Sequence, residues 1–192
     1  MTSWPPAKGP ALTESWTETT VESRVEFQGK IVTLRVDRVR LPGGRFTTRE
    51  IAEHSDSICV VPVDQNGNIL MVRQFRKPLE DQLLEVPAGG IEPGESPEDA
   101  AVRELQEEVG FTSRDMKPLS GFWLAPGWCT EYMYSYLARG LEPSRLPADD
   151  DESITVVPVP LDQVMPMIES GEIQDAKSIA SLLLALRAVN QG

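Results

Sequence analysis

Hydrophobic and polar residues alternate along the first quarter of the chain, between Trp16 and Glu53. The run VESRVEFQGKIVTLRVDRVRLPGGRFTTREIAEH places apolar side chains at every second position over several stretches, as at Val32, Leu34 and Val36. Glycine-containing turn signals interrupt it, at Gly29 and again in LPGG. Alternation with a period of two is typical of half-buried strands, and short glycine or proline turns join antiparallel neighbours. The pattern predicts an antiparallel β meander.

Two longer apolar runs follow, SICVVPVD and ILMVRQFR, separated by the turn sequence QNGN. Near-continuous apolar runs of this length indicate strands buried on both faces, so we expect a strand pair in a central sheet. LLEVPAGG predicts a further short strand that ends at a proline and two glycines. Additional strands are expected around residues 121–137 and 154–160.

One helix is specified by local signals at both ends. Ser96 is a capping residue, Pro97 suits the first turn, Asp99 completes a capping box and Gly110 is a typical terminator. A last helix is expected over residues 176–189. Several strands combined with two or more helices indicate an α+β protein in which helices pack on a mixed sheet.

Charge and composition narrow the classes of partner. The chain has 192 residues, of which 40% are hydrophobic, and its 18 basic and 30 acidic residues give a net charge of −12. This balance disfavours nucleic acid as a partner, because phosphate contacts need Lys and Arg. No stretch approaches a membrane span or an export signal, and the two cysteines have no CxxC spacing. We expect a cytoplasmic protein with a mobile tail at 1–13, the meander at 14–53 and the main domain at 54–192.

The predicted helix carries the candidate chemistry. At about 100° per residue, Glu104, Glu107 and Glu108 share a face beside the apolar arc. Glu104 and Glu108 stand one turn apart, where like charges destabilise a helix. A solvated acidic surface is the simple explanation of such a face. The alternative is a site for hard divalent cations, which take oxygen ligands and commonly lie between carboxylates and phosphates.

The surrounding residues favour the metal site. Nine positions match the pattern GX5EX7REUXEEXGU, in which U is aliphatic or aromatic: Gly89, Glu95, Arg103, Glu104, Leu105, Glu107, Glu108, Gly110 and Phe111. This pattern is the Nudix box, and every specified position is present. The chain therefore resembles the Nudix hydrolases.

The resemblance implies a Nudix fold, an α/β/α sandwich with a mixed sheet, and a set of metal ligands. The implied ligands of Mg²⁺, or of Mn²⁺ in its place, are the carboxylates of Glu104, Glu107 and Glu108 and the backbone carbonyl of Ala88. Arg103 and Glu95 are implied to brace the loop against the helix. Gly89 fits a loop whose backbone approaches the metal closely.

Segments outside the box resemble the ADP-ribose pyrophosphatase branch of this family. They are VRQFRKP, LEVPAGG, APGWCTE with its proline fifteen residues after the box, DDDESITV and GEIQDAKSIASLLLAL. The resemblance implies Mg²⁺-dependent cleavage of ADP-ribose to AMP and ribose 5-phosphate, a place in nucleotide-sugar metabolism, and a homodimer whose N-terminal strands are exchanged between subunits.

The resemblance also implies roles for residues outside the box. Glu152 and Asp150, in the acidic loop DDDESI, are alternatives for the general base, and Glu107 joins the catalytic carboxylates. The implied substrate contacts are Arg49, Glu50, Arg76 and Glu131. An aromatic residue of the meander, Trp16 or Phe27, is implied to stack on adenine.

The sequence is also compatible with other functions. Another nucleoside diphosphate compound, such as an ADP-sugar, a GDP-sugar, NADH or a dinucleoside polyphosphate, fits the same box. A silent ADP-ribose-binding domain is disfavoured because the box is intact, and a decapping enzyme is disfavoured by the acidic charge. His54, the only histidine, is interpreted as structural.

Overall fold

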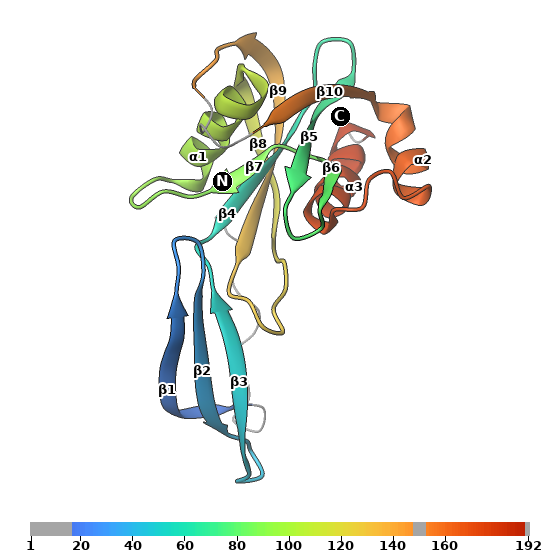
Figure 1. Ribbon diagram of the computed structural model, residues 1–192. Coiled ribbons are helices and arrows are strands. Elements are labelled where there is room, and N and C mark those ends of the chain that lie inside the picture. The colour runs from blue at the N-terminus through green and yellow to red at the C-terminus, as the bar shows by residue number, and fades with distance from the viewer. Residues whose placement is uncertain (1–16, 148–152, 191–192) are drawn as a thin grey trace. The chain divides into compact units, whose positions relative to one another are not determined.

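The computed structural model describes residues 17–147 and 153–190, which form two compact units (Figure 1). The first unit contains the described residues up to Asp56 together with Trp123–Tyr132. The second contains Ser57–Phe122 and the described residues from Met133 onwards. The expected N-terminal tail, Trp16 and the acidic loop at 148–152 lie outside the described residues.

The first unit confirms the meander. Its sheet has the order β1-β2-β3, with antiparallel pairing throughout, and its strands are β1 (Thr19–Gln28), β2 (Thr33–Arg40) and β3 (Phe46–Glu53). The segment 123–132 joins the end of β3, since the N–H of Ala52 donates to the carbonyl of Trp128 at 2.8 Å and the N–H of Thr130 donates to the carbonyl of Ala52 at 3.0 Å. The sequence did not predict this attachment.

The second unit contains two sheets. One has the order β7-β4-β9-β8 and is mixed, because β4 runs parallel to β9 and antiparallel to β7. The other is antiparallel, with the order β10-β5-β6. The strands are β4 (Ser57–Pro62), β5 (Asn68–Arg76), β6 (Asp81–Glu85), β7 (Ala88–Gly90), β8 (Phe111–Trp123), β9 (Tyr132–Pro143) and β10 (Ile154–Pro160).

The expectation that the two apolar runs form a strand pair is wrong. Both runs form strands, but β4 and β5 belong to different sheets, and an isolated bridge joins Val63, just after β4, to Ile69 of β5. The turn between them is organised locally, because the Asp64 carboxylate accepts from the backbone N–H of Asn66 and of Asn68. The strands then separate because β4 pairs with β7 and β9 whereas β5 pairs with β6 and β10, and every residue of β4 is buried.

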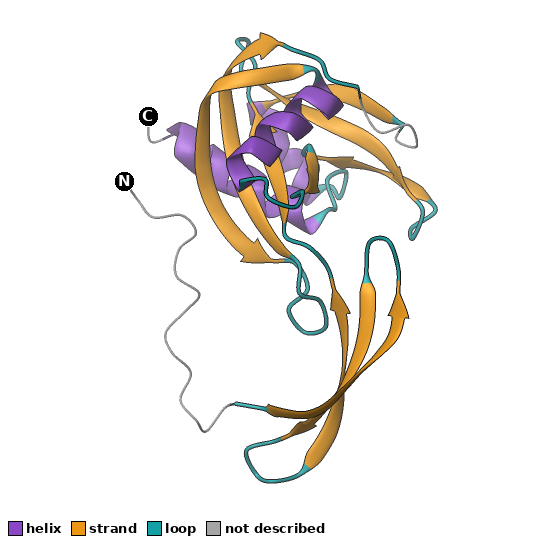
Figure 2. Ribbon diagram, turned by 90° about the vertical axis from the view of Figure 1, so that its left-hand side faces the viewer, coloured by secondary structure: helices purple, strands orange, loops and turns teal. Residues whose placement is uncertain are grey.

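The helices lie on two sides of the mixed sheet (Figures 1 and 2), and α1 and α3 both contact β4. They are α1 (Pro97–Glu104), α2 (Val164–Glu169) and α3 (Ala176–Asn190), with a 3-10 turn at Leu161–Gln163. The core cluster joins Leu105 and Val109 from the α1 region to Ile58 and Val60 of β4. This confirms the α+β class and the helix-on-mixed-sheet arrangement.

The predicted helix boundaries are also confirmed. Ser96 is the N-cap, its hydroxyl accepts from the N–H of Asp99 at 3.1 Å, and Gly110 ends the helical region in a left-handed conformation with φ of 85°. The π-helical form of the last turn was not predicted. Residues Leu105–Val109 form a π-helix, and the N–H of Gly110 donates to the carbonyl of Leu105 at 3.1 Å. Single π turns are often found at functional sites.

Candidate active site

The loop before α1 and the helix itself meet at Gly89. Gly89 lies in β7, opposite Ile58 of β4. A methyl group at Gly89 would lie 1.9 Å from Oε1 of Glu104 and 2.1 Å from its Cδ, which is far inside contact distance. The Glu104 carboxylate therefore occupies the space that a side chain would fill, and only glycine permits this approach.

Glu104 and Glu108 are both withdrawn from solvent, with 9% and 5% of their surfaces exposed. The N–H of Ala88 donates to Oε2 of Glu108 at 3.2 Å, so the backbone of the loop is tied to the second carboxylate. Glu107, one residue away, is more exposed. The structure thus brings together Ala88, Gly89, Glu104 and Glu108.

Arg103 connects the remaining carboxylates. Its guanidinium donates to Glu95 at 2.9 and 3.1 Å, to Glu104 at 2.7 Å, to Glu107 at 2.9 Å and to the carbonyl of Gly90 at 2.9 Å. Hydrogen bonds from Arg103 lower the pKa of Glu95, and that bond to Glu95 contributes most to a raised pKa of Arg103. The implied brace between loop and helix is present, and it also holds two of the implied metal ligands.

These residues surround a polar cavity of about 180 Å³, lined by Ala88, Gly89, Gly90, Glu92, Arg103, Glu104 and Glu107. Within the described residues, no three Asp, Glu, His or Cys side chains are gathered as a ready metal site. The donor set still suits a hard divalent cation, since it consists of carboxylate oxygens and backbone carbonyls. One guanidinium balances only one of the negative charges of its three carboxylate partners, so the cavity favours an added cation.

Arg76, an implied substrate contact, has a carboxylate partner that the sequence did not reveal. Its Nε and Nη2 donate to the two oxygens of Glu85, each at 2.7 Å. Glu85 is only 2% exposed and also pairs with Lys177 of α3. Glu85 and Lys177 are 92 residues apart along the chain, so no local pattern indicates their pairing.

The first unit has a cavity of its own, of about 330 Å³, lined by Glu18, Arg35, Arg49, Ile51 and residues 126–130. Arg49 lies in its wall, paired with Glu18 through two hydrogen bonds of 3.0 and 2.6 Å. Trp128 also lines the cavity and is 60% exposed. Trp128 was not singled out from the sequence, although it lies in the segment APGWCTE that carried the resemblance.

Glu50, Phe27 and Glu131 do not line this cavity. Glu50 follows Arg49 in β3 and projects to the opposite face of the sheet, because successive side chains in a strand alternate. Phe27 lies in β1 and is exposed. Oε1 of Glu131 is 3.8 Å from Nδ1 of His54, whose backbone N–H donates to Thr130. Asp150, Glu152 and Trp16 are outside the described residues.

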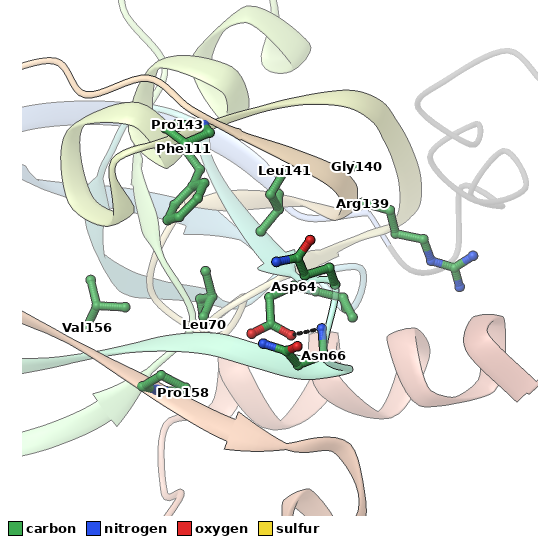
Figure 3. Close-up of a pocket in the computed structure, with 12 residues that line it drawn as sticks. Asp64, Asn66, Leu70, Phe111, Arg139, Gly140, Leu141, Pro143, Val156 and Pro158 are labelled. Atoms are coloured by element: carbon green, nitrogen blue, oxygen red, sulfur yellow. Dashed lines mark hydrogen bonds between the residues drawn. The ribbon is translucent and has the colours of Figure 1, made fainter.

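A larger hollow in the second unit, about 720 Å³, has a different character (Figure 3). Leu70, Phe111 and Val156 surround it, and Arg139 points away from it. Of the box residues only Phe111 lines it, and no carboxylate of the box does. Its one lining carboxylate, Asp64, already accepts from the backbone N–H groups of Asn66 and Asn68. The smaller cavity at Gly89 contains the box carboxylates Glu104 and Glu107 and is therefore the candidate active site.

Comparisons with known proteins agree with this geometry. Residues 53–182 match the NUDIX domain family, and residues 18–51 match the nucleoside diphosphate sugar hydrolase N-terminal domain. The chain is 39% identical over 167 residues to an ADP-ribose pyrophosphatase of Bacillus subtilis, covering 86% of this chain and 90% of that protein. It is 36% identical, over the same shares, to a methanol dehydrogenase activator of Bacillus methanolicus.

A solved structure has the same fold. It is described as an ADP compounds hydrolase and superimposes on this chain with a TM-score of 0.85 at 24% sequence identity. The superposition covers 93% of this chain and 98% of that structure. The NUDIX match over residues 53–182 and the 39% identity to the Bacillus subtilis protein show that the chain belongs to the Nudix family of pyrophosphate hydrolases.

Proposed function

We propose that the protein hydrolyses the pyrophosphate of ADP-ribose to AMP and ribose 5-phosphate, using Mg²⁺ or, in its place, Mn²⁺. The main support for the proposal is that two parts of the chain match two different family domains. The intact box lies in a NUDIX domain, and the first sheet matches an N-terminal domain named for nucleoside diphosphate sugar hydrolases. The name of the Bacillus subtilis relative supports ADP-ribose as the particular substrate.

The metal ligands in this proposal are Glu104, Glu107, Glu108 and the carbonyl of Ala88. When bound, divalent cations polarise the diphosphate and make a water molecule more acidic. Arg103 already holds Glu104 and Glu107 on the cavity wall, so the ligands are oriented before substrate arrives. A carboxylate accepts the proton of the attacking water, and Glu152 and Asp150 are the proposed alternatives for it.

Substrate recognition is proposed to use the local positive charge that the chain as a whole does not offer. Arg76 contacts the diphosphate, and Arg49 contacts the nucleotide in the cavity of the first unit. Trp128 replaces Trp16 and Phe27 as the proposed aromatic partner of adenine, because it is exposed in the same cavity wall as Arg49. Glu50 and Glu131 remain proposed contacts of the substrate.

A homodimer formed through the first unit is also proposed. Its sheet exposes Val21, Val25 and Phe27 on β1 and Phe46 on β3, each about half exposed, and exposed apolar groups on a long edge strand favour association. No helix in the described part of the chain is long and apolar enough to cross a membrane. We further propose that the enzyme acts in the cytoplasm on a small molecule, with neither nucleic acid nor a membrane as partner.

Product analysis tests the proposed reaction. Phosphorus NMR of ADP-ribose incubated with protein and Mg²⁺ is expected to show AMP and ribose 5-phosphate, and a chelator is expected to stop their formation. Glu108→Gln is expected to lower kcat by roughly 100-fold or more, since a lost metal ligand removes several kcal/mol of transition-state stabilisation. Glu98→Gln, the same change at an exposed position of α1, is the control. Normal turnover by Glu108→Gln would contradict the assignment.

A further inference from the structure

A buried cluster of charges lies where β5, β6 and the start of α3 meet. Arg76 ends β5, Glu85 ends β6, and Asp175 and Lys177 flank the first residue of α3. Lys177 Nζ contacts Oε2 of Glu85 and donates to Oδ2 of Asp175 at 2.8 Å. With the two bonds from Arg76 to Glu85, the two cations and two carboxylates form a closed, neutral set. Such an arrangement suits a dry environment.

Each buried group is held in its charged form by its partners. Burial alone would raise the pKa of Glu85, but hydrogen bonds from Arg76 and the charge of Lys177 outweigh it and lower that pKa. Burial would likewise lower the pKa of Lys177, whereas Asp175 and Glu85 raise it. Because removing one partner leaves a buried charge uncompensated, the cluster fixes the positions of its members.

Helix α3 is also tied to the backbone beside Glu85. The N–H of Val86 donates to Oγ of Ser178 at 2.8 Å, and Ser178 in turn donates from its backbone and its hydroxyl to Asp175, at 2.9 and 2.6 Å. Two consecutive residues of the loop, Glu85 and Val86, are therefore held by two consecutive residues of the helix, Lys177 and Ser178.

The held segment leads directly into the candidate active site. The carbonyl of Pro87 accepts from the N–H of Val60, which fixes the loop to β4, and the next residue is Ala88, whose N–H donates to Glu108. On the other side of the cluster, Arg76 is only partly covered, with 37% of its side chain exposed. After Glu85, the charge of Glu108 also contributes to the raised pKa of Arg76, so the guanidinium is within electrostatic reach of the box.

We propose that Lys177 and Glu85 are positioning residues for hydrolysis, holding the Val86–Gly90 loop at the metal ligands and the Arg76 guanidinium in the direction of the substrate diphosphate. The proposal rests on the proposed function. Glu85 uses both oxygens to orient one guanidinium through its Nε and Nη2, and the exposed 37% of the Arg76 side chain leaves the guanidinium accessible to a phosphate oxygen. Lys177 prevents Glu85 from turning away, and Ser178 fixes the loop backbone.

Two substitutions separate these effects. Lys177→Met keeps the length of the side chain and removes its charge, so the loop loosens and metal affinity falls by about 10- to 100-fold, as is usual for partners that orient metal ligands. Glu85→Gln leaves one acceptor oxygen for Arg76 and loses the bidentate ion pair. Its KM for ADP-ribose is expected to rise about 10-fold, with a smaller change in kcat.

The test combines metal-free hydrogen exchange of residues 86–92, followed by mass spectrometry, with Mn²⁺ binding measured by electron paramagnetic resonance. Lys177→Met is expected to speed exchange in this segment about 10-fold more than in β4 and to weaken Mn²⁺ binding. Lys177→Arg is expected to restore both, and Lys117→Met, the same change at an exposed position of β8, to alter neither. Ser178→Ala keeps all charges and is expected to speed hydrogen exchange at Val86. It replaces Lys177→Met in the test if Lys177→Met does not fold.

The proposal is overturned if Lys177→Met or Ser178→Ala leaves exchange of residues 86–92 and Mn²⁺ binding at wild-type values, or changes exchange equally in β4. It is also overturned if Glu85→Gln leaves KM unchanged. Neither exchange nor Mn²⁺ binding requires turnover. A protein that binds Mn²⁺ but does not cleave ADP-ribose would contradict the proposed function, and these two readouts would still decide the role of Lys177.

Discussion

Gly89→Ala is predicted to lower activity about 100-fold while leaving the fold almost intact. The added methyl group would lie 1.9 Å from Oε1 of Glu104, whereas Cβ atoms in proteins essentially never come closer than 3.0 Å to another atom. The Glu104 carboxylate must therefore retreat by about 1.1 Å. It is the far end of a flexible side chain, so the movement requires no rearrangement of the backbone. The cost in unfolding free energy should be about 1 kcal/mol or less.

The cost in catalysis should be much larger. A misplacement of about 1 Å at a reacting centre lowers rates by on the order of 100-fold, because aligned groups no longer meet the substrate in the productive geometry. Glu104 is a proposed metal ligand, so the Mg²⁺ concentration for half-maximal activity should also rise. Gly89→Ala is thus expected to lose about 100-fold in kcat/KM for ADP-ribose, with recovery of part of the loss at high Mg²⁺.

Steady-state kinetics across a Mg²⁺ titration, together with thermal unfolding, provide the assay. Gly43→Ala is the matched control, because no atom lies within 4 Å of a Cβ at that position and it is far from the box in sequence. Wild-type kcat/KM in Gly89→Ala would refute the reasoning. So would a large fall in melting temperature, since the lost activity would then report unfolding rather than a displaced carboxylate.

Three further predictions concern other parts of the molecule. Hydrogen bonds from Arg103 lower the pKa of Glu95 from its ordinary 4.5, so the ionised form stabilises the fold above pH 4.5 and the contribution is lost as pH falls through the lowered pKa. The difference in unfolding free energy between wild type and Glu95→Gln, about 1 kcal/mol at pH 7, should narrow below pH 4.5, and a constant difference would contradict this. Trp128→Ala should raise KM for ADP-ribose about 10-fold with little change in kcat, in keeping with base stacking, and an unchanged KM would exclude Trp128 from the site. Val25→Lys should convert the proposed dimer to a monomer in light scattering, and a dimer of unchanged stability would place the interface elsewhere.

The best predicted elements are those whose signals are local. The helix over the box was predicted to the residue at both ends because Ser96 and Gly110 act within one turn of their own positions. The meander was predicted because its alternation and glycine turns lie within the same segment. Gly89 was expected only as a position whose backbone approaches the metal closely. Its contact with Glu104, whose carboxylate fills the space of the missing side chain, is visible only in three dimensions.

The features that escaped prediction depend on partners distant in the chain. The pairing of β4 with β9 and β7, rather than with β5, is decided by which strands bury both faces of β4. Arg76 was expected at the substrate, and nothing in VRQFRKP indicates its bidentate partner Glu85 or the contact of Glu85 with Lys177. The π turn after Glu104 could not be predicted, because the residue pattern was interpreted with the 3.6-residue repeat of an α-helix.

The preference among substrates tests the central proposal most directly. It is measured as kcat/KM for ADP-ribose, ADP-glucose, GDP-mannose, NADH and diadenosine polyphosphates, with Mg²⁺ and with chelator. The proposal predicts that ADP-ribose has the highest kcat/KM and that chelator abolishes its cleavage. A higher kcat/KM for another compound, or absence of turnover on all of them with Mg²⁺ present, would contradict it.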